Sequence, residues 1–167
     1  MINTNGFYII KSILLVFISA FIAFAQNKQE FNSPDKTIRV VVSNISDGSE
    51  SKIHIYNSKG KILFDTSYIS KDHQHGFKII QTNWTANSKY FVFSLSNSGG
   101  HQPWHYPTFI YCVPDKKLLS VDSIWGAVTS DFKLTPPDSL ETSIKKKDIR
   151  DVEKIKIKIS DFVFGKK

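Results

Sequence analysis

Histidine is the residue type in this sequence best suited to metal or acid–base chemistry, and four of the five histidines fall in two short stretches. His73 and His75 are separated by one residue, which places both imidazoles on the same side of an extended chain. His101 and His105 lie in a second stretch. Because imidazole nitrogens are ligands of zinc and copper, the four side chains are candidates for a metal site. The alternative is that they are solvated loop residues.

Other catalytic signatures are missing from the sequence. It has no G-x-x-x-x-G-K-[ST], no G-x-G-x-x-G, no H-E-x-x-H and no G-x-S-x-G. Glycoside hydrolysis needs paired carboxylates, and nothing in the spacing selects a pair among Asp65, Asp72, Asp122 and Asp131. We therefore expect a protein without catalysis and without a cofactor.

The stretch from Ser98 to Pro107 is unusual for a connection between two strands. Gly99 and Gly100 allow close approach of the backbone, and the two prolines restrict the residues before them to extended conformations. Trp104, His105 and Tyr106 are thus held between Pro103 and Pro107. One interpretation is an aromatic contact surface, because rigid aromatic side chains lose little entropy on binding. The other is that the aromatic residues cap the end of the sheet core. The candidate ligand-binding residues are Trp104, His105, Tyr106, His101 and Trp84.

The first 25 residues have the pattern of a secretory signal peptide. An uncharged apolar stretch over residues 12–24 follows Lys11, and Ala23-Phe24-Ala25 forms a small-x-small cleavage site before a polar stretch. The apolar stretch is short for a membrane span, which needs about 20 residues. We expect a mature chain of residues 26–167 without a transmembrane segment, located in the periplasm or secreted. An uncleaved N-terminal anchor is the alternative.

Composition predicts one packed domain over residues 26–167. The chain of 167 residues is 41% hydrophobic and 13% aromatic, which is too apolar for a disordered protein. The formal net charge is +7, and residues 145–167 carry 9 Lys or Arg against 4 Asp or Glu, a net of +5. The basic character therefore belongs to the C-terminal segment and not to the body of the protein.

Alternating β patterns separated by turn residues predict an all-β fold. The predicted strands cover residues 37–43, 52–56, 61–65, 77–81, 90–96, 108–113, 118–122, 124–128 and 153–160. Glycine, proline, asparagine and aspartate occupy the connections, as expected for tight turns.

Part of this pattern is repeated. Ser33-Pro34-Asp35-Lys36 leads into a predicted strand, and Thr85-Ala86-Asn87-Ser88-Lys89 leads into an equivalent strand 52 residues later. Residues 55–65 and 110–122 repeat a hairpin pattern at an offset of 55 residues. With Trp84 before the second turn, these segments resemble the blade-opening motif of Tol-type and WD-type β-propellers, roughly W-[ST]-P-D-[GS]-K.

The resemblance implies blade-like halves at about residues 33–83 and 84–135. A propeller normally needs roughly 4–8 blades, so two halves do not close one. We therefore expect two blade-like antiparallel sheets packed face to face as a small sandwich. A ring assembled from several chains and a chance repeat are the alternatives.

The predicted strand at 153–160 alternates isoleucine and lysine. Ile155, Ile157 and Ile159 would face the core, while Lys154, Lys156 and Lys158 would face solvent. Lysines on an exposed strand discourage pairing between sheet edges. They also allow weak contact with anionic surfaces. Nucleic acid is not an expected partner, because the segment lacks interleaved aromatic residues and an arginine cluster.

These features predict a small exported, non-catalytic binding module. Its contact surface would be the loop 98–107, and its partner an envelope component or another protein. The alternative function is an envelope hydrolase or a metal-dependent enzyme that uses the histidine cluster.

Overall fold

Short runs of β-branched and aromatic residues form the strands β1 to β12 in the part of the chain that the structure describes. The structure is a computed structural model that describes residues 27–45, 47–99, 104–146 and 151–162. The predicted signal peptide and His101 lie outside these residues.

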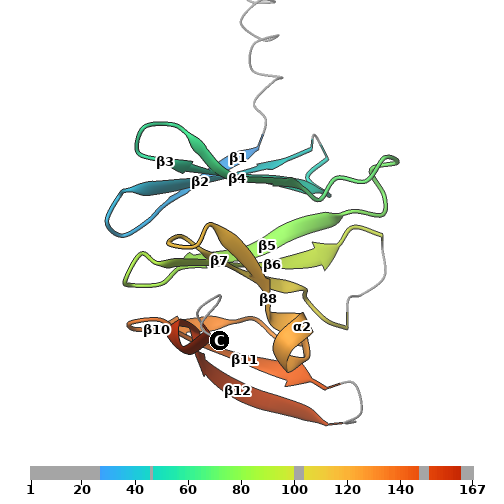
Figure 1. Cartoon of the computed structure of the whole chain (residues 1–167). Helices are drawn as coiled ribbons and strands as arrows, with labels where there is room; N and C mark the ends of the chain where they lie inside the picture. Colours follow the sequence, from blue (N-terminus) through green and yellow to red (C-terminus); the bar gives the residue numbers. More distant parts are fainter. Residues whose placement is uncertain (1–26, 46, 100–103, 147–150, 163–167) are drawn as a thin grey trace, which may run out of the picture.

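The described strands belong to three small antiparallel sheets (Figure 1). The first sheet has the order β1 (Lys28–Asn32), β2 (Ile38–Asn44), β3 (Ser51–Asn57) and β4 (Ile62–Ser67). The second has the order β5 (Phe77–Trp84), β6 (Tyr90–Asn97), β7 (Thr108–Cys112) and β8 (Lys117–Ser120). The third contains β9 (Ala127–Val128), β10 (Lys133–Thr135), β11 (Ser139–Lys145) and β12 (Val152–Lys158). The all-β class and the blade-like antiparallel sheets are confirmed.

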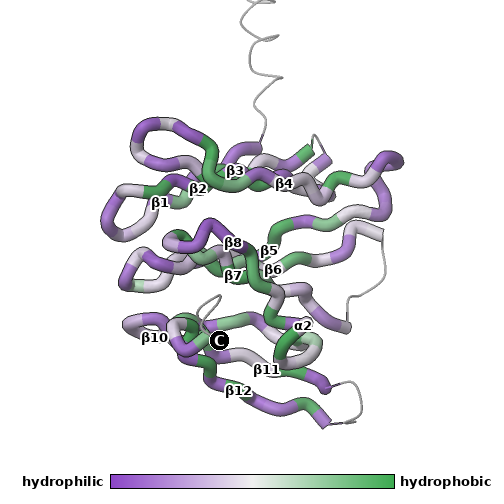
Figure 2. The backbone as a smooth tube through the Cα atoms, in the orientation of Figure 1, coloured by the Kyte–Doolittle hydropathy of each residue, from purple (hydrophilic) through white to green (hydrophobic). Residues whose placement is uncertain are grey.

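The three sheets are stacked as layers, with the second in the middle (Figure 1). On β6, Phe91 and Phe93 belong to the core shared with the first sheet, whereas Tyr90 and Val92 belong to the core shared with the third. The middle sheet is thus apolar on both faces. Figure 2 shows hydrophobic stretches along the backbone of this middle layer. The expectation of a two-layer sandwich is therefore wrong, because the C-terminal strands build a separate third layer.

The repeated turns before β2 and β6 have the same hydrogen bonds. Asp35 Oδ1 accepts from the backbone N–H of Thr37, and Asn87 Oδ1 accepts from that of Lys89. The residues at the tip, Lys36 and Ser88, both adopt positive φ, at 60° and 59°. The repeat between the first two sheets is therefore a repeat of structure and not of composition alone.

The corresponding turn before β11 contains Asp138, 51 residues after Asn87. Asn87 Nδ2 donates to Asp138 Oδ2 at 3.2 Å, which joins the second and third turns across the layers. Residues 136–139 read Pro-Pro-Asp-Ser, close to the Ser-Pro-Asp-Lys of the first turn. This third repeat and the strands β1, β10 and β11 were not predicted.

The third sheet differs from the other two in its edges. β9 and β10 both pair with β11, at different positions along it, and β12 pairs with β11 on the other side. No strand pairs with the outer edge of β12 among the described residues. The described strands therefore form an open stack and not a closed propeller.

Parts of three predicted strands are helical. The helix α2 (Val121–Trp125) replaces the end of the predicted strand 118–122 and the first part of the predicted strand 124–128, of which only Ala127–Val128 is extended. Ser120 caps α2 by accepting a hydrogen bond from the backbone N–H of Ser123, and Asp122 lies in its first turn. The last two residues of the predicted strand 153–160 belong to a short 3₁₀ helix, η1 (Ile159–Phe162), which follows β12 and ends the described chain. In the described ranges no helix has the length and apolar character to cross a membrane.

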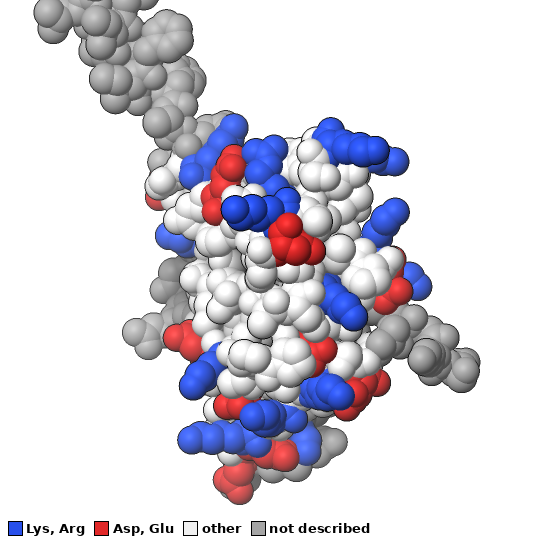
Figure 3. Space-filling view, turned by 90° about the vertical axis from the view of Figure 1, so that its left-hand side faces the viewer, with Lys and Arg blue, Asp and Glu red and all other residues white. Residues whose placement is uncertain are grey.

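The outer faces of the stack are polar. On the first sheet, Arg39 pairs with Glu30 at 3.0 Å, and on the third, Lys156 pairs with Glu141 at 2.7 Å. Figure 3 shows charged side chains gathered around both ends of the stack, with fewer between them. A further sheet on either end would bury these charges at high cost, so both faces suit solvent.

Candidate functional site

The residues 104–107, here named the Trp104 segment, run beside β9 and lead into β7. The backbone N–H of Tyr106 donates to Val128 O at 2.7 Å, and the Tyr106 carbonyl accepts from Thr108 Oγ1 at 2.8 Å. Pro107 O accepts from the backbone N–H of Leu95 in β6 at 2.9 Å. The segment is therefore attached to both the second and the third sheet.

The carboxylate of Asp122 joins the two strands on which the Trp104 segment rests. Its Oδ2 accepts from the backbone N–H of Thr108 at 2.8 Å, and its Oδ1 accepts from that of Val128 at 3.2 Å. Both oxygens thus accept backbone hydrogen bonds, one from the start of β7 and one from the end of β9. Asp122 therefore acts as a clamp that positions the segment. Its engaged oxygens suit this structural role better than the role of a catalytic carboxylate.

Trp104 projects from this anchored segment into solvent. Its relative exposure of 64% is the highest among the exposed large hydrophobic residues of the described chain. The indole ring lies against the imidazole of His105, with ring centroids 4.2 Å apart. The expectation that Trp104 caps the core does not fit this exposure. Tyr106 and His105 are partly buried.

A hollow of about 470 Å³ lies beside Trp104, between α2 and the end of β11. Its floor includes Gly126, whose φ is 124°, a conformation that favours glycine. A Cβ at this position would lie 2.8 Å from the Lys145 carbonyl oxygen, so glycine also allows the close approach of α2 to β11. The full lining consists of Trp104, Asp122, Gly126, Ala127, Lys145 and Lys146.

Two lysines and one carboxylate, that of Asp122, line the hollow. Lys145 and Lys146 are both exposed, and Lys146 pairs with Glu153 at 2.7 Å. No ion pair of Lys145 is present among the described residues, and both oxygens of Asp122 accept backbone hydrogen bonds. An indole face beside exposed ammonium groups can bind an anionic molecule that also has an apolar face.

Trp84, the other predicted contact tryptophan, lies elsewhere. Its relative exposure is 9%, its ring centroid is 5.0 Å from that of Phe91, and its Nε1–H donates to Phe31 O at 3.2 Å. It therefore belongs to the core between the first and second sheets. The structure does not bring it to the surface that carries Trp104.

The described histidines of the predicted cluster lie in two separate segments. His73 and His75 are exposed in the linker between β4 and β5, where His75 Nδ1 contacts Asp72 Oδ2 at 2.5 Å. This contact is the first cause of a pKa of Asp72 far below its usual range. His105 instead contacts Trp104, with the two rings tilted by 43°. Within the described ranges, no three His, Cys, Asp or Glu residues are arranged to hold a metal ion.

A buried carboxylate, Glu50, lies beneath the histidine linker and was not predicted as a functional residue. It accepts hydrogen bonds from Ser70 N at 2.8 Å, Ser70 Oγ at 2.7 Å, Gly76 N at 2.6 Å and Ser98 Oγ at 2.9 Å. Burial opposes ionisation, but the hydrogen bonds from Ser70, Gly76 and Ser98 outweigh it, so the pKa of Glu50 is lowered.

Glu50 fixes the linker and the beginning of the loop that follows β6. Gly76 leaves no space for a Cβ, which would clash with the Tyr68 carbonyl and with the Glu50 carboxylate. The sequence offers little signal for this cluster, because Glu50 is an isolated acid in a polar turn and its partners lie 20–48 residues away. Because four hydrogen bonds fill its oxygens, Glu50 serves structure better than proton transfer.

Cys112 is a buried core residue, as its apolar context predicts. Its Sγ donates to Asp115 Oδ2 at 3.0 Å, and burial raises the pKa of the thiol to about 11. A thiol with a raised pKa is a poor nucleophile at neutral pH.

Comparison of the chain with models of known families, with curated proteins and with solved structures gave no match. The features available to identify its function are therefore its own geometry and charge.

Proposed function

We propose that this protein is an exported, non-catalytic binding module whose contact surface is centred on Trp104, with His105 and Tyr106 beside it. The observation that carries the proposal is an exposed indole on an anchored segment next to a hollow lined by two exposed lysines. Export is supported by the signal-like pattern of residues 1–25, and a periplasmic or secreted location follows from it.

Anchoring matters because binding is weakened by the entropy of ordering a flexible contact. The backbone hydrogen bonds of Tyr106 and Pro107, and the Asp122 clamp, hold the Trp104 segment before any ligand arrives. The indole can then contribute its large contact area at small entropic loss. This arrangement is typical of recognition surfaces carried by loops on a β scaffold.

The chemistry of the hollow favours an anionic ligand. Lys145 and Lys146 can neutralise carboxylate or phosphate groups, while the indole face can cover the apolar side of a ring. We therefore propose as partner a carboxylate- or phosphate-bearing glycan of the cell envelope. The functional alternative, an envelope hydrolase or metal enzyme, is tested by the metal content of the purified protein.

Binding to defined polymers tests the proposal. The probes are polygalacturonate for carboxylates, poly(glycerol phosphate) for phosphates, and neutral dextran. We expect saturable binding of at least one anionic polymer, and about tenfold weaker binding when Lys145 and Lys146 are both changed to alanine.

The matched control changes Lys52 of β3 and Lys61 of the turn before β4 to alanine, which removes the same charge from another surface. An equal loss of affinity in the control would show that the loss in the Lys145 and Lys146 variant reflects net charge and not a local binding site. Binding of none of the three polymers would contradict the proposed ligand class.

A further inference from the structure

The outer edge of β12 occupies the position at which the other two sheets gain a fourth strand. The turn at Asp138 lies between β10 and β11, as the other two turns lie between β1 and β2 and between β5 and β6. β12 then pairs with β11 as β3 pairs with β2 and β7 with β6. In the first sheet β4 pairs with β3, and in the second β8 pairs with β7. The described part of the chain supplies no such strand to β12.

The backbone groups on this edge can be assigned from one hydrogen bond. The N–H of Ile159 donates to Asp138 O at 2.9 Å, so residue 159 faces β11. Backbone groups alternate in direction along a strand, and those of Lys154, Lys156 and Lys158 therefore face the outer edge. Among the described residues, the N–H groups of all three lysines and the C=O groups of Lys154 and Lys156 are thus available to pair with an added strand, whereas the C=O of Lys158 accepts the first hydrogen bond of the 3₁₀ helix η1.

A groove of about 640 Å³ runs along this edge. Ile144, Ile155 and Ile157 contribute to its lining. One end is formed by aromatic side chains, with Trp125 of α2 and Phe162 of η1 in an edge-to-face contact at 4.7 Å between ring centroids. Ile124 and Phe162 are exposed at 48% and 42%. Alternate side chains of an added strand would therefore meet an apolar surface.

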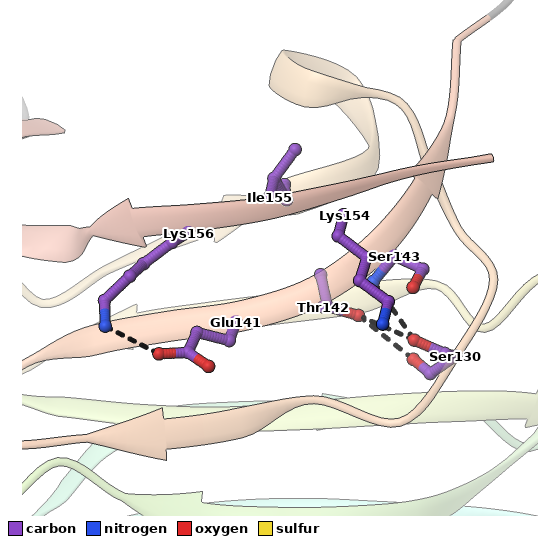
Figure 4. A pocket seen from close by; sticks show the side chains of 7 residues that line it. All are labelled: Ser130, Glu141, Thr142, Ser143, Lys154, Ile155 and Lys156. Atoms are coloured by element: carbon purple, nitrogen blue, oxygen red, sulfur yellow. Dashed lines mark hydrogen bonds and ion pairs between the residues drawn. The ribbon is translucent and has the colours of Figure 1, made fainter.

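The opposite face of β12 presents lysines. Figure 4 shows Ile155 projecting from one side of β12 and Lys154 and Lys156 from the other, where Lys156 reaches Glu141. The remaining side chains of an added strand would lie beside Lys154, Lys156 and Lys158. Acidic residues are favoured at those positions, because opposite charges on adjacent strands stabilise a sheet.

The same lysines select against a second copy of this chain. Antiparallel pairing of β12 with another β12 would bring lysine opposite lysine, and like charges directly opposite are destabilising. Lysines on an edge strand are a known protection against self-association. They leave the edge open to a strand of complementary charge.

We propose that β12 binds an extended strand of a partner protein in which apolar and acidic residues alternate. The strand would complete the third sheet at its fourth position by backbone hydrogen bonds. Its apolar side chains would enter the groove beside Ile155 and Trp125, and its acidic side chains would lie along the lysines. The groove adjoins the hollow beside Trp104, because Lys146 lines both, but the proposed strand pairing does not require a ligand in that hollow.

Peptide binding to the full mature chain tests the proposal. The probe is a fluorescent seven-residue peptide that alternates valine and glutamate, compared with one that alternates valine and lysine. Fluorescence anisotropy should show saturable binding of the acidic peptide, and roughly tenfold weaker binding of the basic one. Changing Lys154 and Lys156 to glutamate should reverse this preference, whereas Lys28→Glu with Lys52→Glu, on the first sheet, should not.

A third peptide separates strand addition from simple charge attraction. N-methylation of alternate backbone amides in the acidic peptide removes the hydrogen bonds with β12 and keeps every side chain. We expect its binding to be lost. Equal binding of the methylated and unmethylated peptides would overturn the proposal. So would the absence of saturable binding, or self-association of the protein that the acidic peptide displaces.

Discussion

Asp35 and Ser88 lie 53 positions apart in the chain, and the backbone N–H of Asp35 donates a hydrogen bond of 3.0 Å to Ser88 Oγ. Both residues belong to the repeated turns that precede β2 and β6. The second turn continues the connection through Asn87 to Asp138 of the third turn. One line of polar contacts thus sets the relative position of all three sheets at the same corner of the stack.

Replacing Ser88 by alanine tests this line of contacts. The change removes the only side-chain acceptor that the described residues offer to the Asp35 N–H, so the free energy of unfolding should fall by about 1–2 kcal/mol. Ser58→Ala, at an exposed turn, should change it by less than about 0.5 kcal/mol. Urea unfolding of the two variants decides, and equal stabilities would show that the contact contributes nothing.

The sequence predicts the first two sheets better than the third for a physical reason. The turns at Asp35 and Asn87 need the same residue types, so their repeat is visible in the sequence. β6 is also easy to recognise, because it has strongly apolar residues on both faces. In β11 the core positions are Leu140, Thr142 and Ile144. A threonine in the middle weakens the alternation, and β11 is missed although its side chains are buried.

Asp122→Asn should loosen the Trp104 segment. The amide keeps one oxygen but places an NH₂ group against one of the backbone donors that the carboxylate accepts. We expect a loss of about 1–3 kcal/mol in stability and faster hydrogen exchange at the Thr108 and Val128 amides. Asp131→Asn is the control, because Asp131 is exposed. Unchanged hydrogen exchange at both amides would show that Asp122 does not hold the segment in place.

The Glu50 cluster should make folding stability depend on acid pH. The folded pKa of Glu50 is lowered, so its contribution is present above the ordinary glutamate pKa of about 4.3 and is lost as pH falls through the folded value. The difference in stability between the wild type and Glu50→Gln should therefore shrink below about pH 4.

Denaturant unfolding between neutral and acid pH measures this difference. Glu153→Gln, which affects an exposed pair with Lys146, serves as the control and should show a smaller change with pH. A gap between wild type and Glu50→Gln that stays constant with pH would contradict the lowered pKa.

The candidate site was only partly visible in the sequence. Trp104 stands out because Pro103 and Pro107 bracket it, but its neighbours Lys145, Lys146 and Gly126 come from distant segments. Nothing in a linear pattern indicates that α2 and the end of β11 meet beside that loop. Trp84 looks equivalent to Trp104 by type, and only the layer that covers it shows that it belongs to the core.

The alternating strand β12 should stabilise the third layer through its isoleucines. Ile157 is buried against Leu140 of β11, so Ile157→Ala should lower the free energy of unfolding by about 2–5 kcal/mol. Lys154→Ala, on the opposite face, should have little effect. Thermal unfolding distinguishes the two, and equal midpoints would mean that β12 contributes no core.

The stability and the ligand affinity of Trp104→Ala, measured on the same preparation, test the central claim most directly. Because Trp104 is 64% exposed, its loss should change stability by no more than about 0.5 kcal/mol. Affinity for the anionic polymer that the wild type binds should fall about tenfold or more, whereas Ile62→Ala, an exposed residue of the first sheet, should leave it unchanged. A strongly destabilised Trp104→Ala that still binds the polymer normally would contradict the contact surface.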